Sequence, residues 1–234
     1  MTDRKIAALT KREAIMGFIY FPIHAFLIPL IITFVAAINP ASAEHKELIT
    51  LGMYVLGTAY CFVFLFQFLK NSFLDVFDVG TKFAKTVIFG MVTEYVLNFA
   101  VTLLLIVITD GITQLSNPNN QAAQAMATSG AIKVVTVLLA PVLEETLFRA
   151  VIFGTLKKYN KFGAYVITIA LFAFYHLWSS FVFEYDWLLW IYLLQYVPAG
   201  LVLCRAYDKT DNIWCPILIH ALLNLISISV MGLM

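Results

Sequence analysis

Six polar side chains able to do chemistry lie inside otherwise apolar segments of this 234-residue chain. They are Glu144, Glu145 and Arg149 in PVLEETLFRA, His176 in LFAFYHLW, and His220 and Asn224 in HALLN. An ionisable side chain at the centre of a membrane helix costs about 2.5 kcal/mol or more by insertion scales. Such side chains usually face a partner or a water-filled cavity, so this pattern indicates a buried functional site.

The two adjacent glutamates must have different roles if they lie on a helix. Consecutive helical residues point about 100° apart, so Glu144 and Glu145 face different neighbours. Glu145 and Arg149 are four residues apart and can form an ion pair that neutralises both charges in an apolar interior. We expect this pair to fix the helix register rather than to act directly, which leaves Glu144 available for chemistry.

The residue types in this set suit hydrolysis of an amide bond. A carboxylate in an apolar environment is a better base near neutral pH, and an imidazole beside it can share a proton and hold a water. Glu144 and His176 are therefore predicted to activate a water molecule. His220 and Asn224 can donate hydrogen bonds to a developing oxyanion, worth about 3 kcal/mol per donor in well-studied proteases. These parts are sufficient for hydrolysis without a covalent intermediate.

The elements that must position these residues are membrane helices. The chain is 62% hydrophobic and 12% charged, which leaves too little polar surface for a soluble globule of this length. Isolated strands cannot satisfy their backbone in hydrocarbon, and the alternation of a barrel is absent. We therefore expect an all-α polytopic bundle forming one integral membrane domain, 1–234, with its motif-bearing core at about 131–230. Seven spans are predicted, at about 14–38, 47–70, 83–109, 131–156, 162–183, 186–206 and 213–233.

Two segments leave the number of helices open between seven and eight. Pro141 removes a backbone donor inside the fourth span and can break that helix into two pieces. The stretch 71–82 mixes apolar and acidic residues and suits a short interfacial helix as well as a loop. The polar stretch at about 110–130 is predicted to be an external loop.

The distribution of basic residues predicts the orientation. With a cytoplasmic amino terminus, only Lys46 and Lys133 lie outside and Arg149 lies within a span. The others then face the cytoplasm: Arg4, Lys5, Lys11, Arg12, Lys70, Lys82, Lys85, Lys157, Lys158, Lys161, Arg205 and Lys209. No cleavable signal peptide is expected, because the first span is too long and follows a basic start.

Helix geometry places the polar side chains at similar depths. Counted from the charged inner end of each helix at 1.5 Å per residue, Glu144, His176 and Asn224 each lie roughly 20 Å into the membrane. His220 lies about 14 Å in, one turn nearer the cytoplasm than Asn224 and on the same face. Three different helices are therefore predicted to present polar groups to one site.

These residues together resemble the three motifs of the CPBP family, the CAAX-processing and bacteriocin-processing membrane proteins, also called the Abi family. The pattern is Glu144-Glu145-x-x-x-Arg149, then Phe172-x-x-x-His176, then His220-x-x-x-Asn224, in the family's order over roughly 131–230. The resemblance implies a glutamate-dependent intramembrane endopeptidase of the bacterial cell membrane. It implies Glu144 as the base, His176 as its assistant, and His220 and Asn224 as oxyanion donors, with Glu145 and Arg149 at the remaining motif positions. The implied substrates are the carboxyl-terminal tail of a prenylated protein or a peptide precursor.

Several alternatives remain open beside that reading. His176, His220 and a carboxylate could hold Zn²⁺, although the H-E-x-x-H spacing is absent and the resemblance favours a metal-free site, so no cofactor is expected. Glu144 and His176 could instead form a hydrogen-bonded strut between helices. A peptide-toxin immunity or scaffold protein would bind without cutting, and a transporter would also bury charges, although no repeated half is present.

The other polar and cysteine residues are less informative. Glu94 is predicted to line the same cavity, to meet Arg149, or to be inert. His24, between Pro22 and Pro29, is expected to serve a helix kink rather than to be a ligand. The cysteines Cys61, Cys204 and Cys215 lack pairing or metal-like spacing and are predicted to pack. The net charge of +1 makes nucleic acid an unexpected partner, leaving the bilayer and a peptide substrate, and the sequence favours no oligomeric state.

Overall fold

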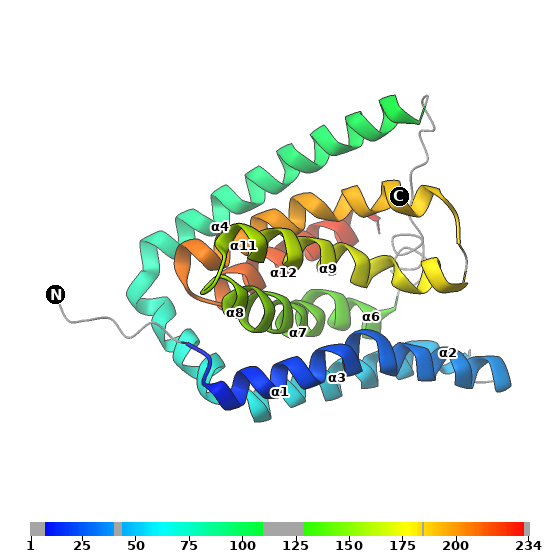
Figure 1. The fold of residues 1–234 in the computed structure, drawn as a ribbon, viewed down its shortest axis with the longest axis horizontal. Coiled ribbons are helices and arrows are strands. Elements are labelled where there is room, and N and C mark those ends of the chain that lie inside the picture. Colours follow the sequence, from blue (N-terminus) through cyan, green and yellow to red (C-terminus); the bar gives the residue numbers. More distant parts are fainter. Residues whose placement is uncertain (1–7, 40–43, 110–128, 184, 232–234) are drawn as a thin grey trace.

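The computed structural model describes residues 8–39, 44–109, 129–183 and 185–231, and within these ranges helix is the only regular secondary structure. The described residues form seven continuous helical stretches that correspond in order to the seven predicted spans. Successive stretches run in opposite directions between the two ends of the molecule (Figure 1). The prediction of an all-α polytopic bundle is confirmed.

The bounds of the elements are as follows. The first three stretches are α1 (Lys11–Pro22), η1 (Ile23–Leu27) and α2 (Ile28–Ile38); α3 (Lys46–Phe64); and α4 (Phe66–Ile108). The fourth is α6 (Gly130–Val134), η3 (Val135–Leu139), α7 (Ala140–Glu145), η4 (Thr146–Phe153) and α8 (Gly154–Leu156). The last three are α9 (Lys161–Phe183); α10 (Leu188–Tyr192), η5 (Leu193–Tyr196) and α11 (Val197–Thr210); and α12 (Trp214–Met231).

Most of these stretches have the length and composition of membrane spans. Five of them among the described residues are long and apolar enough to cross a membrane, and α12 provides a shorter apolar helix, Trp214–Val230. The exception is the stretch from α6 to α8, whose charged residues are Lys133, Glu144, Glu145 and Arg149. Its place in the bundle accounts for this exception.

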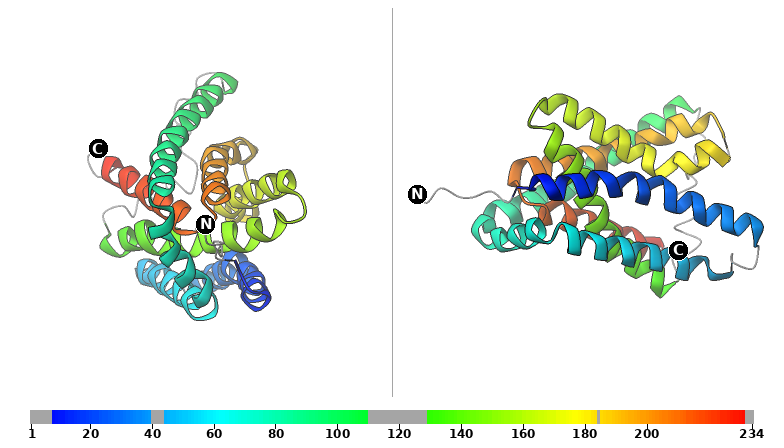
Figure 2. Two further views of the ribbon diagram at one scale, coloured as in Figure 1. Left: turned by 90° about the vertical axis from the view of Figure 1, so that its left-hand side faces the viewer. Right: turned by 60° about the horizontal axis from the view of Figure 1, so that its bottom comes forward.

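The α6–α8 stretch is the central helix of the bundle. Every residue from 143 to 154 is buried, and the stretch contacts α1, α3, α9, α11 and α12 (Figures 1 and 2). The neighbouring helices separate these residues from lipid, so a charged side chain here meets protein rather than hydrocarbon. The fold thus places Glu144, Glu145 and Arg149 inside the bundle, where their charges can be paired.

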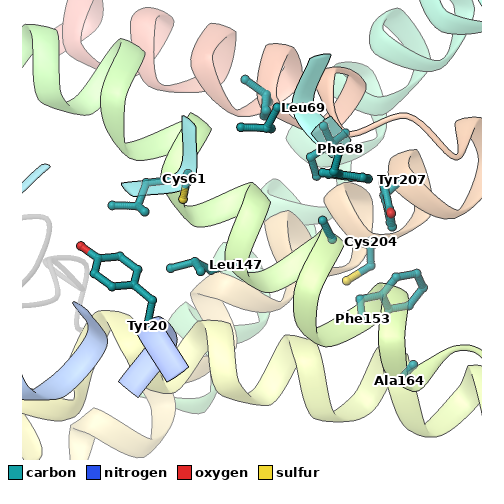
Figure 3. Close-up of a cluster of buried hydrophobic side chains, with 13 residues drawn as sticks. Tyr20, Cys61, Phe68, Leu69, Leu147, Phe153, Ala164, Cys204 and Tyr207 are labelled. Carbon is teal, nitrogen blue, oxygen red and sulfur yellow. The ribbon is translucent and has the colours of Figure 1, made fainter. Parts of the chain in front are cut away.

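Apolar side chains around the central helix form the largest core. Figure 3 shows Leu147 and Phe153 of η4 among side chains from α3, α4 and α11, including Cys61 and Cys204. Cys215 belongs to a second cluster between α4, α11 and α12. All three cysteines are free and buried, which confirms the prediction that they pack.

Two prolines inside the spans follow wider, π-helical turns and do not break their helices. Pro29 comes just after the π-helical segment η1, and Pro141 comes just after the π-helical segment η3. In η3 the Ala140 N–H donates to the carbonyl of Val135, five residues back. Pro141 therefore does not split the fourth span, and it contributes no eighth helix. In this π-helical register the next bond would run from the N–H of residue 141 to the carbonyl of Thr136. Proline has no N–H, so the Thr136 carbonyl lacks its helical donor.

The stretch 71–82 is helical and belongs to α4. This helix bends at Gly80, where the backbone leaves the helical region (φ 1°, ψ −82°), and its first part lies across one end of the bundle (Figure 1). The Asn212 side-chain amide donates to the carbonyl of Ser72 (2.6 Å), and the Ile213 N–H donates to the Ser72 hydroxyl (3.0 Å). The short interfacial helix is therefore an arm of the third span that anchors the start of α12.

Ion pairs join helices at that same end of the molecule. Lys157 contacts Asp211 at 2.8 Å, and Lys161 contacts Asp208 at 2.6 Å. These lysines are among the residues predicted to face the cytoplasm. The predicted polar loop at about 110–130 lies almost wholly outside the described residues.

Candidate active site

Helices α7, η4, α9 and α12 bring five of the six predicted residues into two adjoining groups. Glu144 lies beside His176, with Oε2 of the carboxylate 4.0 Å from Nε2 of the imidazole. Glu145 lies between Arg149 and His220. The sixth residue, Asn224, makes a separate contact.

The ring of His176 is fixed in a way that determines which nitrogen faces Glu144. Its Nδ1 lies 2.8 Å from the carbonyl oxygen of Phe172, one turn earlier on α9. A carbonyl can only accept, so Nδ1 carries the hydrogen, and the neutral ring presents the lone pair of Nε2 to Glu144. The ring also stacks on Tyr196 at 4.5 Å between centroids. Two acceptors therefore face each other at a separation that suits a donor placed between them.

This pair is buried but not sealed. The side chain of Glu144 is 6% exposed and that of His176 is 15% exposed. The carboxylate thus lies in the protein interior, while the imidazole beside it remains reachable. Such an arrangement allows a small molecule to reach the face that the two groups share.

The predicted ion pair between Glu145 and Arg149 is present. Oε1 of Glu145 lies 2.9 Å from Nη1 of Arg149 and 2.8 Å from Nδ1 of His220, and both members of the ion pair are fully buried. The guanidinium also stacks over the ring of Phe172 at 4.2 Å. Phe172 therefore supports both Arg149, through its ring, and the orientation of His176, through its carbonyl.

His220 is held by this group rather than directed at Glu144 through Nδ1. Because the carboxylate of Glu145 accepts, Nδ1 of His220 carries a hydrogen. Nε2 can then donate to a further group only when the ring is the imidazolium form. With His220 in that form, the negative charges of Glu144 and Glu145 would equal in number the positive charges of Arg149 and His220.

Asn224 satisfies the carbonyl that Pro141 leaves without a donor. Its amide nitrogen donates to the carbonyl oxygen of Thr136 at 2.7 Å, and Thr136 is the residue whose π-helical partner would be position 141. A buried carbonyl without a partner is costly, so this contact stabilises the turn above the two glutamates. The described contacts of Asn224 include none with Glu144 or His176, and its second amide hydrogen remains available.

Three side chains near Glu144 were not anticipated in these roles. Oε1 of Glu144 accepts from the phenol of Tyr54 at 3.3 Å and from that of Tyr175 at 3.5 Å, and the second phenol lies 3.4 Å from Nε2 of His24. Tyr175 precedes His176 in the chain, which is a weak signal in hindsight. Tyr54 carries no motif that would mark it, because aromatic residues are common in membrane helices, and His24 was expected to serve a helix kink instead.

Glu94 is separate from these groups in the contacts that are described. Its carboxylate accepts from the amide of Asn98 at 3.1 Å, one turn further along α4. The described contacts of Arg149 are with Glu145, Phe148 and Phe172 and include none with Glu94. No group of three or more His, Cys, Asp or Glu residues able to hold a metal ion occurs within the described ranges.

Comparisons with known proteins single out the same part of the chain. Residues 127–226 match the family model described as "Type II CAAX prenyl endopeptidase Rce1-like". The chain is 33% identical over 92 residues to "Putative membrane peptidase YdiL" of Bacillus subtilis (strain 168), covering 39% of this chain and 33% of that protein. It is 31% identical over 93 residues to "UPF0177 protein YxdF" of Lactococcus lactis subsp. lactis (strain IL1403), covering 40% and 46%. The matches thus span less than half the length of each relative, and no solved structure matches.

Proposed function

We propose that this chain, whose residues 127–226 match the Rce1-like family model, is an intramembrane endopeptidase of the CPBP family that hydrolyses a peptide bond with water activated by Glu144 and His176. The observation that carries the proposal is the pair itself. Oε2 of Glu144 and the lone pair of Nε2 of His176 face each other at 4.0 Å within the central part of the bundle. A water that donates one hydrogen to each is held with its own lone pairs free for attack.

The proposed reaction consumes one water for each bond cleaved. The water oxygen attacks the carbonyl carbon as Glu144 takes a proton, which forms a tetrahedral intermediate with a negatively charged oxygen. When the carbon–nitrogen bond breaks, that proton passes to the departing nitrogen, and the products are a carboxylic acid and an amine. Glu144 ends as it began, so the cycle needs no covalent enzyme intermediate.

Stabilisation of the oxyanion is proposed for His220 and Asn224. Each has one donor beyond its described contact: Nε2–H of the imidazolium form of His220, and the second amide hydrogen of Asn224. Glu145 contacts the other nitrogen of His220, Nδ1, and so fixes Nε2 as the nitrogen that can face the substrate. In this proposal Glu145 and Arg149 act on the reaction through His220 and through the helix register.

The proposed substrate is a peptide that reaches the site from the membrane or its cytoplasmic surface. The family description makes a farnesylated peptide ending in a Cys-a-a-X sequence the first probe, and a membrane-associated peptide precursor the second. The proposed orientation, with the amino terminus in the cytoplasm of a bacterial cell, gives either peptide access to the end where the lysines gather.

Replacement of Glu144 with Gln tests the proposal. The change keeps the shape and removes the base, so turnover should fall by about a thousandfold or more while the protein remains folded. Glu94→Gln is the matched control, because it removes another buried membrane carboxylate that contacts Asn98 only in the described residues. Mass spectrometry of the farnesylated peptide, and of membranes from cells with each variant, measures the products.

The outcome also separates the proposed enzyme from its rivals. Cleavage that persists in Glu144→Gln at the level of Glu94→Gln would overturn the assignment. A protective effect against a peptide toxin that survives Glu144→Gln would favour a binding protein. Loss of cleavage on chelation, with recovery on adding Zn²⁺, would favour a metal site over the pair described here.

A further inference from the structure

The two oxygens of the Glu144 carboxylate have different surroundings. Oε2 faces His176, whereas Oε1 faces two phenol groups, from Tyr54 at 3.3 Å and Tyr175 at 3.5 Å. The two phenol oxygens lie 3.2 Å apart. Oε1 is thus enclosed by hydroxyl donors while Oε2 remains on the side of the imidazole.

The chain of contacts continues to His24 of η1. Nε2 of this buried imidazole lies 3.4 Å from the phenol oxygen of Tyr175, and Nδ1 has no hydrogen-bond partner among the described residues. A buried N–H without an acceptor is rarer than a buried acceptor without a donor. The hydrogen is therefore placed on Nε2, from which it is donated to Tyr175. Tyr175 can then donate onward, and Tyr54 donates to Glu144, so the hydrogens are directed toward Oε1.

Ring packing holds this arrangement from both sides. His24 packs edge-on to Tyr54 at 5.5 Å and stacks on Tyr20 at 5.8 Å, and Tyr175 packs against Phe148 at 5.4 Å. Aromatic contacts of this kind restrict ring rotation, so the phenol oxygens are directed at the carboxylate by their neighbours. The hydroxyl groups are positioned before any substrate arrives.

A glycine allows α3 to approach closely enough for these contacts. A Cβ at Gly57 would lie 2.8 Å from Leu143, the neighbour of Glu144, and 2.9 Å from the phenol oxygen of Tyr20. Gly57 is one turn from Tyr54 on the same helix. The absence of a side chain here brings Tyr54 within reach of Oε1.

We infer that Tyr54, Tyr175 and His24 form a hydrogen-bonded branch that positions Glu144 and keeps Oε2 as its reactive oxygen. The inference rests on the proposed function and extends it to α1–α3, which lie outside the family match at 127–226. Two of the three members, His24 and Tyr54, come from that part of the chain. The first helices are then part of the active site and not only a scaffold around it.

Tyr54→Phe and Tyr175→Phe test the branch by removing single hydroxyl groups and keeping the rings. One donor to a charged group is lost in each, so kcat should fall about tenfold with KM changed less than about twofold. The double variant should fall further than either. Tyr60→Phe is the matched control, because that phenol also joins α3 to α1, through the Met16 carbonyl at 3.1 Å, without touching Glu144. The probe is the farnesylated Cys-a-a-X peptide with each full-length variant in detergent.

A second readout does not depend on cleavage. Dicyclohexylcarbodiimide modifies carboxylic acids in their protonated form, so loss of hydroxyl donors to the carboxylate should speed the labelling of Glu144. Labelling is followed by tandem mass spectrometry, which separates Glu144 from its ion-paired neighbour Glu145. The rate should rise about tenfold in each phenylalanine variant relative to Tyr60→Phe.

The two readouts separate this inference from the proposed function. If wild-type protein cleaves the peptide and Glu144→Gln does not, but Tyr54→Phe and Tyr175→Phe match Tyr60→Phe in kcat, the branch is overturned and the peptidase stands. If wild-type protein cleaves nothing, the proposed function fails, and labelling at the control rate would overturn the positioning of Glu144 as well. Slower turnover together with faster labelling supports the branch.

Discussion

At the residue scale, the two neighbouring glutamates differ in what surrounds them. One oxygen of Glu145 forms an ion pair with Arg149 at 2.9 Å and contacts Nδ1 of His220 at 2.8 Å. Among the described residues no cation lies so close to Glu144, which is instead enclosed by the phenol groups of Tyr54 and Tyr175 and by the imidazole of His176. The 100° rotation between consecutive helical residues causes this difference. It directs the carboxylate of Glu145 toward α12 and that of Glu144 toward α3 and α9. In the proposed mechanism the same rotation gives Glu145 a structural role and leaves Glu144 as the base.

Replacement of Arg149 should therefore lower the free energy of unfolding, because its main role is to pair with Glu145. Arg149→Met leaves Glu145 buried without its main partner, and breaking a buried pair in this way costs about 3–5 kcal/mol. Unfolding in detergent, followed by heat or denaturant, measures the loss. Lys161→Met is the control: it removes an ion pair with Asp208 whose lysine side chain is 64% exposed, and such pairs contribute about 0–1 kcal/mol. Equal stability of the two variants would contradict the structural role.

At the scale of the elements, irregular helical turns shape the site. The π-helical segment η3 and Pro141 leave the Thr136 carbonyl without a helical donor, and α12 supplies one through Asn224. Wider turns of this kind occur often at functional sites. Here the irregular turn requires a specific partner on another helix, and so it fixes how α12 sits against the central helix.

A double-mutant cycle measures that dependence. Asn224→Ala alone leaves a buried carbonyl unsatisfied and should cost about 1–3 kcal/mol. Pro141→Ala returns an N–H to the chain, so Asn224→Ala should cost about 1 kcal/mol less in that background. The free energy of unfolding of the four proteins gives the coupling. Additive losses would show that Asn224 does not serve the carbonyl freed by the proline.

Close contact between helices depends on particular glycines. A Cβ at Gly17 of α1 would clash with Val151 of η4, whereas nothing lies within 4 Å of a Cβ at Gly52 of α3. Gly17→Ala should thus destabilise the protein by about 1–3 kcal/mol through overpacking. Gly52→Ala should be neutral or stabilising by up to about 1 kcal/mol, because alanine is the better helix former. Thermal unfolding compares the two, and equal midpoints would contradict the packing of α1 on the central helix.

At the scale of the whole molecule, the bundle surrounds its charges with apolar helices. The charged central helix is enclosed by α1, α3, α9, α11 and α12, while lipid-facing surfaces carry large apolar side chains such as Phe34, Phe89 and Val107. This arrangement lets a membrane protein hold two carboxylates, a guanidinium and imidazoles at depth. Most of the basic residues then lie at one end, which predicts the orientation.

The orientation can be measured with single introduced cysteines. Lys158→Cys lies at the predicted cytoplasmic end and Asp186→Cys at the opposite end, and the native cysteines are buried and should react little. A maleimide that does not cross membranes should label Asp186→Cys in intact cells and Lys158→Cys only after lysis. The reverse pattern would invert the proposed topology.

The sequence by itself determined the fold class, the seven helical stretches and most of the candidate site. Spans follow from runs of consecutive apolar residues, and the polar set is visible because Glu144, His176 and His220 are rare residue types in such runs. The Glu145–Arg149 pair was also predictable, since a separation of four residues on a helix is a local property. Each of these features depends on neighbours along the chain.

Only the tertiary structure decided which side chains from distant segments meet Glu144 and Asn224. Tyr54 is ordinary in an aromatic-rich membrane protein, and His24, although rare in an apolar run, lies between two prolines that favoured a role at a helix kink. Their direction is set by how α1 and α3 are rotated and how closely they approach the central helix, as at Gly57. Helix rotation and distance arise from packing between residues far apart in sequence, so local periodicity does not specify them.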